Sequence, residues 1–130
     1  MDFDDFEDDS TRGDALHQSK ADIIEGMREY LAGMLDGGGE AGYTSADIGE
    51  CDRVLDAYLD TVEDADAGDE DAILAAMEYT VRALNSLNAR CHGHLIETDQ
   101  RGPLRDLIVQ AARERGVGSG ADLTKPWREW

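Results

Sequence analysis

The chain has 130 residues, 30 of them acidic and 12 basic, and carries a formal net charge of −18 at pH 7. This length suffices for one domain with its own hydrophobic core. Lys20 and Lys125 are its only lysines, so little could neutralise phosphates, and direct binding of nucleic acid is not expected. The acidic start MDFDDFEDDS does not resemble a signal peptide, and no run is long enough to span a membrane, which favours a cytoplasmic protein.

The first thirteen residues combine six acids and two phenylalanines with no periodic pattern. Such a composition is typical of a disordered acidic tail, because few apolar side chains recur where they could be buried together. We therefore expect residues 1–13 to form a disordered tail and residues 14–130 to form a single helical domain.

Apolar residues recur at helical spacing in the first half of the domain and predict two helices. The first covers residues 16–36 and ends at the run of glycines at 37–39, because glycine carries a large entropic penalty inside a helix. Thr44 with Asp47 three residues later is an N-terminal capping signal. The apolar stripe behind it predicts a second helix over residues 45–64.

The second half of the domain predicts two more helices and a short end. The third helix covers residues 70–91, and the fourth opens at Thr98 or at Gly102-Pro103 and closes at Gly116. The end, DLTKPWREW, predicts a short helical turn. No strand alternation occurs, so the fold class is all-α: a four-helix up-down bundle or a close variant.

Cysteines and histidines in the chain suggest the ligands of a zinc site: Cys51, Cys91, His92 and His94. If the second and third helices form an antiparallel hairpin, however, Cys51 lies level with about residue 83, roughly 12 Å from Cys91 at 1.5 Å per residue. That distance also exceeds the roughly 7 Å between Cα atoms that a disulfide tolerates. We therefore expect two reduced core cysteines, no metal site and no cofactor.

Carboxylates form a column along one side of the second predicted helix, at i, i+4, i+8 and the next position on the same strip. They are Asp52, Asp56, Asp60 and Glu63. Glu25 and Glu29 on the first predicted helix could face this column. Facing carboxylates hold magnesium in all-helical nucleotide pyrophosphatases, so a magnesium-dependent enzyme resembling them is the alternative function. No phosphate loop or nucleophile motif accompanies them, which favours a binding role over an enzymatic one.

Polar side chains also crowd the predicted entry to the fourth helix. Glu97, Thr98, Asp99 and Arg101 form a secondary polar patch that could recognise a partner, because loops on a rigid scaffold often carry binding residues. In the structural alternative, Thr98 caps the helix and Arg101 pairs with Glu97.

The charge is distributed unevenly along the chain. Residues 1–80 hold 24 acids and 4 bases, a net charge of −20, whereas residues 81–130 hold 6 acids and 8 bases, a net charge of +2. Salt adaptation or genome bias should affect both halves alike. We therefore predict an acidic protein that masks a basic protein surface, in particular an immunity protein or an inhibitor of a toxin such as a nuclease, with a DNA mimic as a further alternative. Its predicted contacts are the carboxylate column together with Glu25 and Glu29.

Overall fold

Four α-helices make up most of the chain. In the computed structural model, which describes the backbone of residues 3–118 and 122–130 and the side chains of residues 15–118 and 122–130, they are α1 (Phe3–Asp36), α2 (Ser45–Asp64), α3 (Glu70–Arg90) and α4 (Thr98–Glu114). No strand is present in these ranges, so the predicted all-α class with four helices is confirmed. None of the helices in the described part of the chain is long and apolar enough to cross a membrane.

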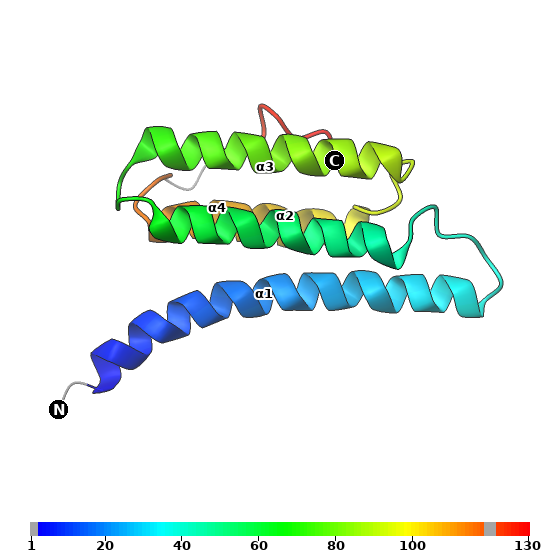
Figure 1. Cartoon of the computed structure of the whole chain (residues 1–130), viewed down its shortest axis with the longest axis horizontal. Coiled ribbons are helices and arrows are strands. Elements are labelled where there is room, and N and C mark those ends of the chain that lie inside the picture. The colour runs from blue at the N-terminus through cyan, green and yellow to red at the C-terminus, as the bar shows by residue number, and fades with distance from the viewer. Residues whose placement is uncertain (1–2, 119–121) are drawn as a thin grey trace.

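Consecutive helices run in opposite directions (Figure 1). α2 and α4 lie between α3 on one side and α1 on the other. α1 packs against both α2 and α4, and α2 packs against α3. α1 is therefore an outer helix, held to the rest of the bundle along two seams.

Hydrogen bonds from capping side chains explain where α2 and α3 begin. At α2, Thr44 Oγ1 accepts from Asp47 N at 3.4 Å and the Asp47 carboxylate accepts from Thr44 N at 2.8 Å, so the predicted capping box is present. At α3, the Asp69 carboxylate accepts from Ala72 N at 3.2 Å. Each bond satisfies a backbone N–H that has no partner inside the helix. The predicted boundaries of both helices are correct to within one residue.

The fourth helix begins at Thr98, the earlier of the two predicted starts. Glu97 occupies the N-cap position, and its backbone N–H donates to Gln100 Oε1 at 3.3 Å. Pro103 lies inside the helix, where it lacks the N–H that would bond to the Asp99 carbonyl. Asp99 is exposed, so water can bond to that carbonyl and the helix continues past the proline.

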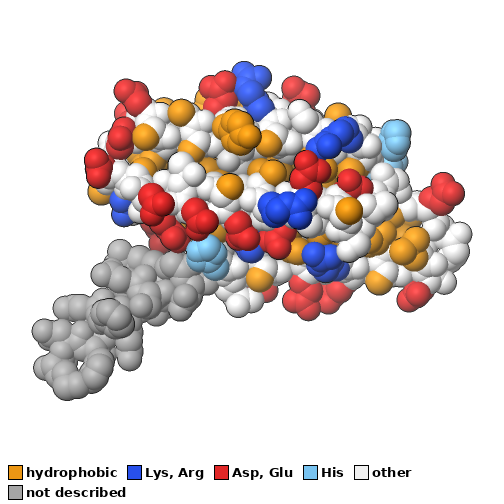
Figure 2. All heavy atoms as spheres, viewed as in Figure 1, with side chains coloured by type: hydrophobic (Ala, Val, Ile, Leu, Met, Phe, Trp, Pro, Cys, Tyr) orange, Lys and Arg blue, Asp and Glu red, His pale blue; other side chains and the backbone are white. Residues whose placement is uncertain are grey.

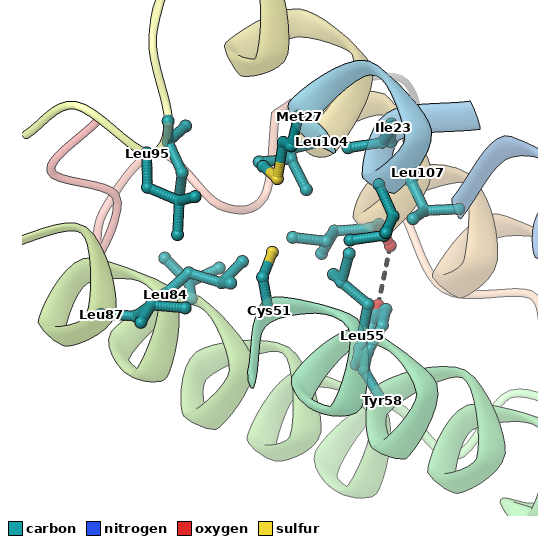
Figure 3. Close-up of a cluster of buried hydrophobic side chains, with 14 of the residues drawn as sticks. Ile23, Met27, Cys51, Leu55, Tyr58, Leu84, Leu87, Leu95, Leu104 and Leu107 are labelled. Atoms are coloured by element: carbon teal, nitrogen blue, oxygen red, sulfur yellow. Dashed lines mark hydrogen bonds between the residues drawn. The ribbon is translucent and has the colours of Figure 1, made fainter. Parts of the chain in front are cut away.

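One hydrophobic core runs through the bundle and draws on all four helices. Figure 3 shows buried side chains from each of them pointing toward one another: Met27 from α1, Cys51 and Leu55 from α2, Leu84 and Leu87 from α3, and Leu104 and Leu107 from α4. The phenol of Tyr58 lies in the same cluster and donates to the Ile108 carbonyl at 2.7 Å. Because its hydroxyl is paired, burying Tyr58 carries little desolvation cost.

α1 begins at Phe3, well before the predicted start at Leu16. The backbone from Phe3, expected to belong to a disordered tail over residues 1–13, is therefore helical. Residues 1 and 2, and the side chains of residues 3–14, lie outside the described part of the chain. Helix propagation explains the difference, because each residue added to an existing helix gains a hydrogen bond without a new nucleation cost. The acid-rich sequence there also suits the positive end of the helix dipole.

The C-terminal segment forms the predicted helical turn, in which Trp127 N donates to the Thr124 carbonyl at 3.1 Å. Asn85 of α3 binds this segment through both ends of its side-chain amide. Its Nδ2 donates to the Trp127 carbonyl at 2.7 Å, and its Oδ1 accepts from Glu129 N at 3.1 Å. Trp127 and Trp130 are partly buried against the core. Asn85 therefore fastens the C-terminal segment to α3.

Candidate functional site

Lys20 of α1 lies between the first two carboxylates of the column. Its Nζ donates to Asp52 Oδ1 at 2.6 Å and to Asp56 Oδ1 at 2.7 Å, and its side chain is only 14% exposed. Burial alone would lower the pKa of Lys20, but the hydrogen bonds and charges of the two aspartates outweigh it and hold the pKa above its ordinary value. Asp52 and Asp56 are therefore occupied by an internal cation that joins α1 to α2.

The other two carboxylates of the column have no lysine or arginine partner among the described side chains. Glu63 Oε1 lies 3.2 Å from His17 Nε2, and both side chains are more than 40% exposed (46% and 41%). Asp60 is exposed, and its carboxylate has no hydrogen bond or ion pair to any side chain that the structure describes. The column thus divides into a closed half, Asp52 and Asp56, which Lys20 binds, and an open half, Asp60 and Glu63, which no described lysine or arginine binds.

Glu25 and Glu29 lie on the outer side of α1 and do not face the column. Both are exposed. At 100° per residue each lies about 160° around the helix from Met27, which is fully buried. Within the described ranges, no group of three or more histidine, cysteine, aspartate or glutamate side chains is placed to hold a metal ion. The two sets of carboxylates that the magnesium alternative needs therefore point in different directions.

A wider acidic surface, of which only Asp60 and Glu63 were predicted as contacts, forms where α2 passes into α3. It holds seven exposed carboxylates and we name it the acidic pole: Asp60, Glu63, Asp64, Asp66, Asp69, Glu70 and Asp71. No residue between 60 and 71 is a lysine or arginine. Figure 2 shows acidic side chains gathered at this end of the bundle. The open half of the column belongs to the pole, so the two surfaces are continuous.

The loop of the acidic pole is fixed to the end of α4. The Arg115 guanidinium donates to the Ala65 carbonyl, and Gly68 N donates to the Arg115 carbonyl at 2.7 Å. Gly68 has a φ of +78°, a conformation that glycine adopts at no steric cost. These contacts present the carboxylates of the pole from an ordered turn.

The secondary polar patch at the start of α4 is partly used in local structure. Glu97 is the N-cap residue, so the prediction that Thr98 caps the helix is wrong by one position. The Glu97 carboxylate lies 3.2 Å from His94 Nδ1, and no ion pair joins it to Arg101 among the described side chains. His94, three residues earlier in the chain, is the partner of Glu97 in place of Arg101. Thr98, Asp99 and Arg101 are exposed.

Both cysteines are free and buried, as expected for core residues. Burial raises the pKa of the Cys51 thiol to about 12 and that of the Cys91 thiol to about 11. The thiolate, which is the form that attacks electrophiles or binds metals, is therefore scarce at neutral pH. His92 and His94 are exposed, whereas both thiols lie in the core. The structure therefore does not assemble the four zinc-type ligands into one site.

Lys20 is the residue at the carboxylate column that the sequence prediction missed. It falls within the apolar stripe of α1, four residues before Ile24 and seven before Met27, both of which are buried. A lysine in such a stripe is rarely buried without a partner of opposite charge. The place of Lys20 in this apolar stripe therefore indicates that the lysine is paired with carboxylates of the same chain.

Comparisons with known proteins do not identify a relative. No family model, no curated protein and no solved structure matches this chain. Function is therefore inferred from the charge and geometry of the chain itself.

Proposed function

We propose that this protein binds a basic protein in the cytoplasm and masks its positively charged surface, in particular as an immunity protein or an inhibitor of a toxin such as a nuclease. The acidic pole carries the proposal, because seven exposed carboxylates lie within twelve residues that include no lysine or arginine. The proposed contacts are the pole, which includes Asp60 and Glu63 of the column, with Glu25 and Glu29 as outer contacts on α1. Asp52 and Asp56 have a supporting role, since they hold α1 in place through Lys20.

Negative charge concentrated at one end of the molecule destabilises the unbound protein and favours the binding of a basic partner. Carboxylates crowded at one end repel one another and weaken the compact state. A partner that supplies lysines and arginines relieves this repulsion, and complementary charge raises the rate of encounter. Surfaces that bind nucleic acid are rich in such cations, because they neutralise phosphates. A nuclease surface is therefore a chemically suitable target.

The ordered turn adds to this proposal. The pole is held by Arg115 at its loop and by Asp69 as the cap of α3. Carboxylates on an ordered scaffold lose less conformational entropy on binding than those on a flexible tail. The pole is thus suited to binding a partner with little rearrangement.

A binding measurement with the product of the neighbouring gene, where that product is a basic protein, tests the proposal. Calorimetry should detect a complex whose Kd rises at least about tenfold when the salt concentration is raised from about 50 mM to about 300 mM, because salt screens exposed charge. If the partner is a nuclease, its activity should be lost in the complex. A neutral protein of similar size serves as the control. The absence of a complex, or an affinity insensitive to salt, contradicts the proposal, and magnesium-dependent pyrophosphate release from nucleotides would support the alternative enzyme.

A further inference from the structure

A groove of about 1030 Å³ follows the seam between α1 and α4, and none of the carboxylates of the acidic pole lines it. Its apolar lining comes from both helices and includes Leu16, Ile23, Pro103 and Leu107. The lining spans Leu16 to Tyr30 on α1, a length of roughly 21 Å at 1.5 Å per residue. The groove therefore matches about four turns of a helix in length.

Carboxylates stand on both sides of this groove. Asp22 lines it from α1, and Asp99 and Asp106 line it from α4, and all three are exposed. Of the two arginines in the lining, Arg105 is paired with Asp106 at 3.1 Å and Arg113 lies near the C-terminal end of α4. With Asp122, the lining holds four carboxylates against two arginines, a formal charge of −2 above an apolar floor. Asp22 and Asp99 are the exposed carboxylates of the lining that have no lysine or arginine partner among the described side chains.

The floor is open at Gly26. A Cβ atom built at Gly26 would meet no other atom within 4 Å, so the backbone of α1 is accessible there. Tyr30, one turn further along α1, is 43% exposed although its ring is apolar. An apolar side chain from outside could therefore rest on Gly26 beside the Tyr30 ring.

We propose that this groove binds an amphipathic helix of a basic protein partner, with the apolar stripe of that helix on the floor and its lysines and arginines facing Asp22 and Asp99. Helix-in-groove recognition uses apolar anchors at i, i+3, i+4 and i+7, which suits a groove between two antiparallel helices. Charge selects this occupant over a second copy of the chain, which would bring a net charge of −18 to acidic rims. The inference shares the basic partner with the proposed function but rests on a separate surface.

The probe for this groove is a synthetic peptide of about 18 residues, with leucines at helical i, i+3, i+4 and i+7 spacing and lysines elsewhere. A peptide of the same composition in scrambled order measures charge attraction alone. Fluorescence anisotropy with the full chain should show the patterned peptide binding at least about tenfold more tightly than the scrambled one. Equal binding of the two peptides would overturn the inference.

Two glycine variants locate the binding site. Gly26→Trp fills the groove and should weaken binding of the patterned peptide at least about tenfold, because the floor is blocked. Gly33→Trp is the matched control: Gly33 lies about 10 Å further along α1, its Cβ also meets nothing within 4 Å, and it does not line the groove. This control should change affinity less than about twofold. Circular dichroism and thermal unfolding establish that both variants are folded.

Three further results distinguish a basic helix from a second copy of the chain in the groove, and distinguish the groove from the acidic pole. Full affinity in Gly26→Trp would overturn the groove as the peptide site. A dimer of the wild-type chain in sedimentation analysis, dispersed by Gly26→Trp, would assign the groove to a second copy and overturn the proposed occupant. The double variant Asp64→Lys/Asp66→Lys leaves the groove intact. If it no longer binds the patterned peptide, the peptide binds at the acidic pole, and the groove is overturned as its binding site.

Discussion

Lys20 binds two carboxylates that would otherwise repel each other on one side of α2. Asp52 and Asp56 lie four residues apart, where like charges destabilise a helix. The lysine lies within hydrogen-bond distance of both and is largely buried, so solvent screens these bonds less than it would at the surface. The pair of bonds therefore determines how firmly α1 is held to α2.

Replacement of Lys20 by methionine keeps the apolar stem and removes the charge. The free energy of unfolding should fall by about 1–2 kcal/mol, because Asp52 and Asp56 lose their cation while remaining partly exposed to water. Urea denaturation measures the change. Lys125→Met, at the other lysine, which is exposed, is the control and should change stability by less than about 0.5 kcal/mol. Equal losses in the two variants would contradict the role of Lys20.

The Cys51 thiol should make the free energy of unfolding fall as the pH rises into the alkaline range. Burial holds its pKa at about 12 in the folded protein, against an ordinary value of about 9. Below about pH 9 both states keep the proton, so the thiol adds no pH dependence. Between about pH 9 and 12 the unfolded chain loses the proton and the folded chain keeps it, so stability falls by up to about 1.4 kcal/mol per pH unit.

Urea unfolding of the wild-type chain and of Cys51→Ala, measured from about pH 8 to about pH 10.5, tests this linkage. The variant loses packing at every pH, but its stability should fall less steeply as the pH rises, because one titrating thiol is gone. Cys91 and Tyr58 remain in both proteins as the shared background. Identical slopes would show that Cys51 does not titrate in this way.

Among the elements, the C-terminal segment is bound to α3 by one side chain, that of Asn85. Asn85→Ala leaves the Trp127 carbonyl and the Glu129 N–H without their partner, and should lower the free energy of unfolding by about 1–3 kcal/mol. Tryptophan emission should also shift to the red as the segment loosens. Ser86→Ala, at the next and exposed position of α3, is the control. Unchanged emission in Asn85→Ala would contradict the fastening role.

The helices differ in how much of each could be predicted from the sequence. α2 and α3 follow from local signals, since Thr44, Asp47 and Asp69 cap them and the apolar stripe fixes their faces. The start of α4 could not be decided, because Pro103 inside a helix is tolerated only where the freed carbonyl reaches water. The start of α1 at Phe3 was missed because propagation from an existing helix leaves no apolar period in the sequence.

At the scale of the whole molecule, the sequence predicts the excess of acid in the first half but not which carboxylates are free. Lys20 and Asp52 are 32 residues apart in the chain, so only the packing of α1 on α2 brings them together. The acidic pole is contiguous in sequence, yet its exposure depends on where α2 ends and α3 begins. The groove combines residues of α1 and α4, which no local pattern connects.

Binding of the basic partner should depend on the location of the negative charge, at the acidic pole, and not on net charge alone. Two double variants separate these effects, because each makes the chain more positive by four charges. Asp64→Lys/Asp66→Lys reverses charge at the pole. Asp36→Lys/Glu40→Lys reverses two exposed acids at the opposite end of the bundle, where α1 leads into α2 (Figure 1).

The rate constant for association with the basic partner at low salt is the most direct measurement, because charge complementarity acts chiefly on the rate of encounter. Stopped-flow mixing should show association slowed at least about tenfold by Asp64→Lys/Asp66→Lys and less than about threefold by Asp36→Lys/Glu40→Lys. Equal slowing by the two double variants would contradict a binding surface at the acidic pole.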